Sequence, residues 1–467
     1  MRANLRNMKG QALILFLGFT AAIVGIALVA FNSGQVTNAK MRAMNAADAA
    51  AYSGAVWEAR TLNFQAYMNR AMIANEVTIA QSVSLRSWID YVARFISNIN
   101  TVAQFVPYLG TATTAVSRVM DQVDRAAQQV LSQAESGIRT LNQAEHEAQV
   151  VINGSAPVIA RELAREIAQR NGAETTRASE ALFTANGVSY FGLTETYSRN
   201  SRPNINRRDD GRRRLRDVVL NSRDGFTRAR DWSPNFWPLP FGFRKQGGTD
   251  LIDYDAWKAM DSAMLCGQTL FSGCKNFLPL GWGGAQAYNT QNPVSRIGRH
   301  GDRNDWNNLA GRAARLAAIR SPGANQIWNW RTTGQFPNYR DVQNFDTRNA
   351  RANMLPFAVE VVIKEGSIPS ANSDFQAKAA LTDGSTIEHD PQYVRDGGVF
   401  ALAESCVTFE RPFNAPRVGG GREFPSLFNP YWRASMATED RTVRLAVDAA
   451  KGVTPVAAIA AGRGSCR

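Results

Sequence analysis

The chain has 467 residues and a formal net charge of +13, and its 53 basic residues include only eight lysines. This length allows about three units of roughly 150 residues each. Three histidines, and the lack of any Cys-x-x-Cys, His-Glu-x-x-His, phosphate-loop or Gly-x-Ser-x-Gly motif, exclude the sites that such motifs define. We therefore predict no catalytic residue, no metal and no cofactor.

The first predicted element is a transmembrane helix over residues 11–34, after a basic leader over residues 1–10. Residues 12–31 carry no charge, and about 20 helical residues span the roughly 30 Å hydrocarbon core of a bilayer. The run is longer than the apolar part of a signal peptide, and no small-x-small cleavage site follows it. Because Arg2, Arg6 and Lys9 precede the run, the positive-inside rule places the N-terminus in the cytoplasm.

Residues 35–185 are predicted to form a helical stalk or bundle outside the membrane. Of 18 prolines only Pro107 and Pro157 precede residue 200, and a proline inside a helix costs about 3 kcal/mol. Apolar side chains at spacings of three and four predict a helix–helix contact through Leu85, Trp88, Ile89, Val92, Ile96 and Ile99.

A second helix is predicted to turn back after the break at Pro107 and Gly110. Its apolar residues follow a repeat of about 3.5, as in a coiled-coil seam: Val116, Met120, Val123, Ala127, Val130, Ala134, Ile138 and Leu141. The segment "INGSAP" at 152–157 predicts the end of this helix, with Pro157 in the first turn of a third helix that runs to about Ala185. The bundle packs on itself or against copies of the chain.

The remainder is predicted to be an arginine-rich linker over residues 186–230 and a loop-rich mixed head over residues 231–467, which makes the fold class α+β. The segments 354–366 and 397–412 are rich in β-forming residues and are predicted strands. The arginine-dense stretch 198–217 is interpreted as a solvated loop, with contact to a polyanion as the alternative. No aromatic residue is interleaved with its arginines, so nucleic acid is not an expected partner.

Acidic residues at 250–261 are expected to cap helices or lie on the surface rather than to form a hydrolytic pair: Asp250, Asp253, Asp255 and Asp261. Four cysteines suit an oxidising compartment. The short loop between Cys266 and Cys274 favours that disulfide, and Cys406 with Cys466 follows by elimination. Four free thiols are the alternative.

Residues 9–55 resemble the N-terminal segment of TadE/TadG-like proteins, which are minor pilin or pseudopilin-like components of tight-adherence (Flp) pilus machines. The shared parts are a basic leader, a glycine, an apolar helix that begins Gln-Ala-Leu, a hydrophilic exit and the run "NAADAAA" at 45–51. The resemblance implies a peptidase cut between Gly10 and Gln11. Leu15 stands where processed subunits often carry a glutamate, which favours an anchored TadG-like protein over a repeated shaft subunit.

The resemblance implies a non-enzymatic, single-pass component of the inner membrane, with the bulk of the chain in the periplasm or at the cell surface. Its expected partners are other pilus or pseudopilin subunits, the inner-membrane assembly machinery, membrane lipid and a prepilin-type peptidase. The alternative is a membrane-anchored extracytoplasmic enzyme or polyanion-binding receptor with its site in the C-terminal head.

Overall fold

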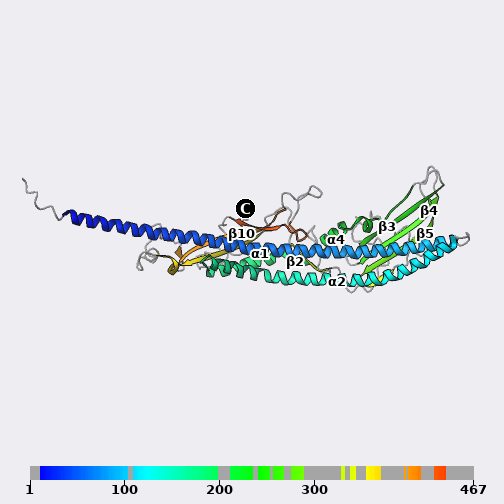
Figure 1. The fold of residues 1–467 in the computed structure, drawn as a ribbon, viewed down its shortest axis with the longest axis horizontal. Coiled ribbons are helices and arrows are strands. Elements are labelled where there is room, and N and C mark those ends of the chain that lie inside the picture. Colours follow the sequence, from blue (N-terminus) through cyan, green and yellow to red (C-terminus); the bar gives the residue numbers. More distant parts are fainter. Residues whose placement is uncertain are drawn as a thin grey trace, which may run out of the picture.

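The computed structural model describes twelve segments of the chain: residues 11–103, 109–197, 211–234, 240–252, 256–267, 275–288, 328–331, 337–342, 354–369, 394–395, 398–411 and 425–437. Its longest element is α1 (Gln11–Ala103), one helix of 93 residues. At a rise of about 1.5 Å per residue this helix is about 140 Å long. The N-terminal part of α1 extends alone, and the other elements lie along the rest of it (Figure 1).

The second long helix, α2 (Leu109–Arg170), runs back along α1 and makes a helical hairpin (Figure 1). Near its C-terminal end α2 presents a buried alanine every four residues, at Ala156, Ala160, Ala164 and Ala168, and α1 presents buried alanines between residues 43 and 59. Such small side chains let two helix backbones approach closely. The predicted helical hairpin is therefore present.

The predicted helix end at 152–157 is wrong, because α2 continues through Pro157. The segment is held from three sides. Asn153 is buried and accepts hydrogen bonds from Gln65 and Thr194, Ala156 packs in the core, and Pro157 lies against Gly187. Proline has no backbone N–H, so the helix lacks one hydrogen bond at this position. The stabilisation from these contacts offsets that loss. The third helix, α3 (Arg177–Leu193), begins later, where the Thr176 side chain caps the backbone N–H of Ser179.

The first sheet packs on the hairpin next to the exposed N-terminal part of α1. Its strands are β1 (Glu174–Thr175), β8 (Leu355–Lys364), β9 (Val394–Arg395), β10 (Gly398–Phe409) and β11 (Trp432–Ala437), all paired antiparallel in the order β1-β8-β10-β11, with β9 on β10. The two predicted strands are confirmed as β8 and β10. Gly54 of α1 lies so close to the Phe357 ring that a Cβ would clash with it, so sheet and helix share one core.

The second sheet packs on the distal half of α1. It contains β3 (Phe241–Ile252), β4 (Ala256–Gly267) and β5 (Lys275–Tyr288) as an antiparallel meander, with β6 (Trp328–Arg331) parallel to β5. A short pair, β2 (Thr194–Tyr197) and β7 (Tyr339–Val342), has its own antiparallel ladder. A single turn, η3 (Glu365–Ser367), follows β8.

Two short helices occupy part of the predicted linker: α4 (Gly211–Asn221) and α5 (Gly225–Arg228). Leu215 and Arg216 of α4 are buried, and Arg214 forms an ion pair with the buried Asp341 at 2.7 Å. The loop interpretation is therefore wrong for residues 211–217, which are helical, and Leu215 and Arg216 are not solvated. Residues 198–210 lie outside the described segments. The mixed helix and strand fold is confirmed, but the strands do not form a separate head, because both large cores combine α1 with strands.

Candidate assembly and anchoring sites on the long helix

The N-terminal fifth of α1 is apolar and entirely exposed. Every residue from 12 to 31 is exposed, and Ile14 and Phe16 expose 72% and 70% of their surface. By length and composition this part of α1 is able to cross a membrane. Its backbone groups are paired within the helix, and the Thr20 hydroxyl donates to the Phe16 carbonyl oxygen at 2.8 Å. The hydrocarbon core of a bilayer requires such internal pairing, because it offers no water to polar groups.

The predicted processing point lies at the start of this helix. Gly10 is outside the described residues, and Gln11 is the first residue of α1. Leu15, where the resemblance places a glutamate, is 75% exposed. The cut between Gly10 and Gln11 stays a prediction.

The folded body begins shortly after the apolar segment ends. Ala39 of α1 is buried against Val399 of β10, and the Lys40 amine donates to the Phe400 carbonyl oxygen at 2.7 Å. Only eight residues, about 12 Å of helix, separate position 31 from Ala39. The first sheet is therefore tied to α1 directly next to the apolar segment.

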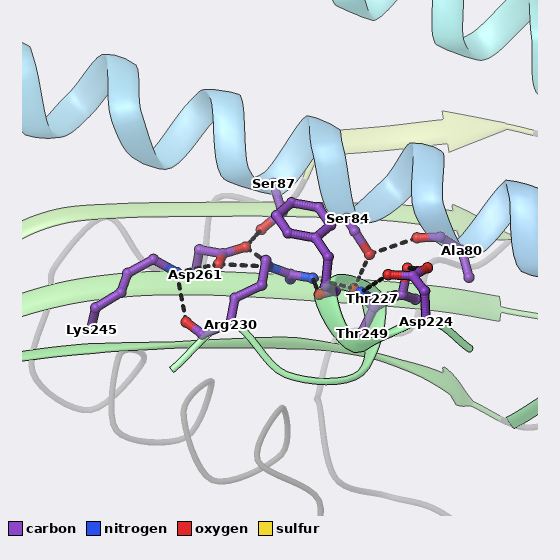
Figure 2. A network of polar contacts seen from close by, with 10 residues as sticks. Ala80, Ser84, Ser87, Asp224, Thr227, Arg230, Lys245, Thr249 and Asp261 are labelled. Atoms are coloured by element: carbon purple, nitrogen blue, oxygen red, sulfur yellow. Dashed lines mark hydrogen bonds and ion pairs between the residues drawn. The ribbon is translucent and has the colours of Figure 1, made fainter. Parts of the chain in front are cut away.

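A buried ion cluster joins the second sheet to α1, and Figure 2 shows it. Asp261 of β4 is 1% exposed. The Arg230 guanidinium donates to both of its oxygens, at 2.8 and 2.9 Å, and the Lys245 ammonium donates to Oδ1 at 2.6 Å. The Ser87 hydroxyl of α1 donates to Oδ2 at 2.7 Å.

The Asp261 carboxylate is held in its ionised form. Burial raises its pKa, but the charges and hydrogen bonds of Arg230 and Lys245 outweigh burial, and the net effect is a lowered pKa. An ionised carboxylate with all these donors has no proton to give and little affinity for one. The cluster is therefore suited to joining elements and unsuited to acid–base chemistry.

A second row of hydroxyl contacts continues this joint along α1. Ser84 contacts the Thr249 hydroxyl of β3 at 2.6 Å, and Arg230 donates to the same hydroxyl at 3.3 Å. Gln81 donates to Asp224. The Asp224 carboxylate caps α5 by accepting from the backbone N–H of Thr227 at 2.9 Å, and Figure 2 shows Asp224 and Thr227 side by side. The joint thus links α1 with β3, β4 and α5.

Another buried polar cluster lies between α1, α2 and the second sheet. Glu76 of α1 accepts hydrogen bonds at 3.0 Å from Arg139, Asn142 and the Trp257 indole. Glu135 of α2 is also buried. Burial raises its pKa to about 8, with Arg139 lowering and Glu76 further raising it. Sequence reasoning missed these residues, although Glu135, Arg139, Asn142 and Gln149 recur at spacings of four, three and seven, which places them on one face of α2.

The predicted packing residues of α1 are not buried as a set. Ile89 is buried, Val92 and Ile96 are half-buried, and Leu85, Trp88 and Ile99 are exposed. The predicted seam of α2 is also exposed at Val116, Val123, Val130 and Leu141. Ile138 of the predicted seam packs against the second core cluster, and polar side chains also join this part of the hairpin, including the ion pair of Arg86 with Asp124. A contact of the apolar stripes with another chain stays a prediction.

The surface role predicted for the acidic residues is wrong for the two that the structure describes. Asp250 pairs with Arg223 at 2.8 Å and Asp261 lies in the ion cluster, and both are buried. Asp253 and Asp255 lie outside the described residues. Among the described residues no group of three or more His, Cys, Asp or Glu side chains is arranged to hold a metal ion.

The cysteine pairing stays a prediction. Cys266 of β4 and Cys406 of β10 are buried, and neither is a free thiol. Their predicted partners, Cys274 and Cys466, lie outside the described residues.

Residues 10–57 match the family model of TadE/G-like Flp pilus-assembly proteins (Tad). The matched stretch contains the exposed apolar part of α1 and the first alanines that pack against α2 and the first sheet. No curated protein matches the chain, and no solved structure matches it. The match agrees with the resemblance found in residues 9–55 and indicates a role in pilus assembly.

Proposed function

We propose that this chain, whose N-terminal segment is TadE/G-like, is a non-enzymatic, single-pass membrane component of a Flp/Tad-type pilus assembly system. The observation that carries the proposal is the position of the family match. It covers the part of α1 that is apolar and exposed and continues to residue 57, inside the folded body. One uninterrupted helix therefore joins the anchor to the body.

The basic leader supports an N-terminus in the cytoplasm and a body in the periplasm or at the cell surface. In this orientation the first sheet lies close to the outer face of the inner membrane, and the second sheet lies at the far end of α1. The proposed partners are other pilus or pseudopilin subunits and the inner-membrane machinery. A prepilin-type peptidase is proposed to act between Gly10 and Gln11.

Charge placement favours this function over the polyanion-binding alternative. Several arginines face carboxylates inside the fold rather than solvent, as in the pairs Arg139 with Glu76, Arg223 with Asp250 and Arg230 with Asp261. Clustered, solvated cations are what a polyanion groove requires. The enzyme alternative gains no support from Glu76 and Asp261, because these two carboxylates accept structural hydrogen bonds.

The test is the N-terminus and membrane behaviour of the full-length chain in its native host. Alkaline carbonate should leave the protein in the membrane pellet, and mass spectrometry should find Met1 or, after processing, Gln11. The matched variant Val24→Arg places a charge at the centre of the apolar segment, which costs about 3 kcal/mol of insertion. It should reduce the membrane-bound fraction, whereas Met44→Arg, in the exit of the helix, should not.

A mature chain that begins after residue 31 and is recovered in the soluble fraction would refute the anchor. Piliation measured in a deletion strain tests the assembly role separately. Normal piliation without the chain would refute that role even if the protein is membrane-bound.

A further inference from the structure

Two buried carboxyl groups of the helical hairpin lack the hydrogen bonds that other buried acids of this chain receive. Glu58 of α1 and Glu135 of α2 are each 1% exposed, and neither carboxyl has a hydrogen-bond partner among the described residues. By contrast, the equally buried Glu76 and Asp261 accept hydrogen bonds from cationic side chains at 2.6 to 3.0 Å. Fold and charge are therefore matched at Glu76 and Asp261, but not at Glu58 and Glu135.

Glu58 lies where α1 meets α2 and α3. It precedes Gln65 by seven residues, which is about two helical turns, so the two side chains lie on one face of α1. Gln65 donates to Asn153 of α2 at 3.1 Å and to the Tyr190 hydroxyl of α3 at 3.3 Å. Because α2 runs back along α1 (Figure 1), the residue of α2 that is level with Glu58 lies about seven positions after Asn153. That residue is Ala160, which is fully buried and offers the carboxyl no hydrogen bond.

The elements around Glu58 bring it no compensating charge. The titratable group that faces it from α3 is the Tyr190 phenol, and Glu58 contributes to the raised pKa of that phenol. Arg340 of β7 acts on the phenol. From β8, Phe357 packs against Gly54, one turn before Glu58. Burial is thus the cause that raises the pKa of Glu58 well above its ordinary value.

Glu135 lies where α2 meets α1 and the second sheet. It comes one turn before Arg139, which donates to Glu76 of α1. In the antiparallel hairpin this places Glu135 about one turn beyond Glu76, level with Ile79 of the second core cluster. The second sheet meets this region with the neutral Trp257 indole. Burial raises the pKa of Glu135 to about 8, because the opposing charges of Arg139 and Glu76 do not offset it.

We propose that proton binding by Glu58 and Glu135 controls how tightly α2 closes on α1. While both carboxyls carry a proton they are neutral, and the hairpin is closed. A carboxylate formed in the closed hairpin finds no hydrogen-bond donor in the described part of the chain, so it requires water, and α2 has to move away from α1 locally. Each acid that becomes exposed makes this opening about ten-fold more favourable per pH unit, between its ordinary pKa and its higher folded pKa.

The two acids control separate parts of the hairpin. Glu58 lies at the height of the first core cluster, and Glu135 lies beside the second. Local opening near one acid can therefore occur while the other remains buried. This property distinguishes a local, proton-controlled closure from a uniform loss of stability.

The test is amide hydrogen exchange of the full-length chain in detergent, measured for separate peptides of α2 from about pH 5 to about pH 8. After the intrinsic pH dependence of exchange is divided out, the opening constant of the wild type should rise about ten-fold per pH unit. Glu58→Gln should flatten this rise around Ala160 and leave it in place around position 135. Glu135→Gln should have the reverse effect, because each amide keeps the shape of the acid and cannot ionise.

Glu166→Gln is the matched control, because the Glu166 side chain also lies on α2 but is 54% exposed. It should leave both profiles unchanged, and circular dichroism should show the same helix content in all variants. A wild-type opening constant that does not change with pH would overturn the proposal without any variant. So would a rise that Glu58→Gln and Glu135→Gln both leave in place, or one that each flattens equally along the whole chain. None of these results changes the membrane extraction, the N-terminal mass or the piliation that test the proposed function.

Discussion

Ser87 of α1 donates a hydrogen bond to Asp261 of β4 at 2.7 Å, although the two residues are 174 positions apart in the sequence. This contact ties the second sheet to the long helix through a carboxylate that two cations already hold. The sheet is thus fixed to α1 by a buried ionic joint as well as by apolar packing.

Replacing Asp261 by asparagine should strongly destabilise this joint. Asp261→Asn leaves Arg230 and Lys245 buried beside a neutral amide, and removing one partner of a buried ion pair costs about 3–5 kcal/mol. Thermal unfolding followed by circular dichroism in detergent should show a clearly lower midpoint. Ser87→Ala, which removes one hydrogen bond, should cost only about 1 kcal/mol. Equal midpoints for wild type and Asp261→Asn would contradict a structural role for the cluster.

Acid should weaken the same joint. Because the pKa of Asp261 is lowered in the folded protein, its contribution to stability is complete above the ordinary value of 3.8 and is lost as the pH falls through the lower, folded value. Unfolding midpoints measured from pH 5 downward should fall more steeply in wild type than in Asp261→Asn. Parallel profiles would show that the carboxylate is not ionised in the fold.

Glu135 should make the folded protein less stable as the pH rises, whereas Asp261 makes it less stable as the pH falls. Its folded pKa of about 8 exceeds the ordinary 4.5, so the unfolded chain loses its proton first, and stability decreases as the pH rises from 4.5 to about 8. Glu135→Gln removes this ionisation and should flatten the profile in that interval, with a gain in stability at pH 8. The measurement is the free energy of unfolding as a function of pH. If Glu135→Gln leaves the slope of the free energy of unfolding against pH unchanged, a group other than Glu135 binds the proton in this interval.

A methyl group at Gly283 should separate the second sheet from α1. A Cβ there would collide with the backbone of Ser87 and Tyr91, which has no flexible end that could move away. Gly283→Ala should cost about 1–3 kcal/mol. The control is Gly154→Ala, because Gly154 has open space around it within α2 and alanine favours a helix by about 1 kcal/mol. Amide hydrogen exchange in β4 and β5 should increase only in the first variant.

The sequence predicts the helical part of the fold well because helix signals are local. An uncharged run of about 20 residues, and proline-free stretches on either side of one break, are sufficient to predict α1 and the return of α2. The β-rich runs that became β8 and β10 are similarly local. The prediction that α2 ends near Pro157 was wrong because the continuation of α2 depends on Asn153 and Ala156. The partners of these two residues lie on other elements.

The predicted apolar stripe of α1 does not coincide with the face that the distal half of this helix buries within the chain. An apolar stripe indicates the face that avoids water, and Leu85 and Trp88 satisfy that pattern. The chain instead buries Ser84 and Ser87, because the second sheet brings Thr249 and Asp261 to meet them. Only the assembled sheet reveals those partners. Gly281 and Gly283, spaced two apart in β5, were the local signal of a close approach to α1.

Under the proposed membrane anchoring, the absence of any break in α1 between position 31 and Ala103 gives the apolar segment mechanical leverage over the far end of the molecule. These 72 residues measure about 108 Å, and a tilt of about 20°, which is ordinary for a membrane helix, moves Ala103 sideways by about 37 Å. A small change in how the apolar segment sits among its neighbours in the bilayer is thus amplified into a large displacement of the second sheet.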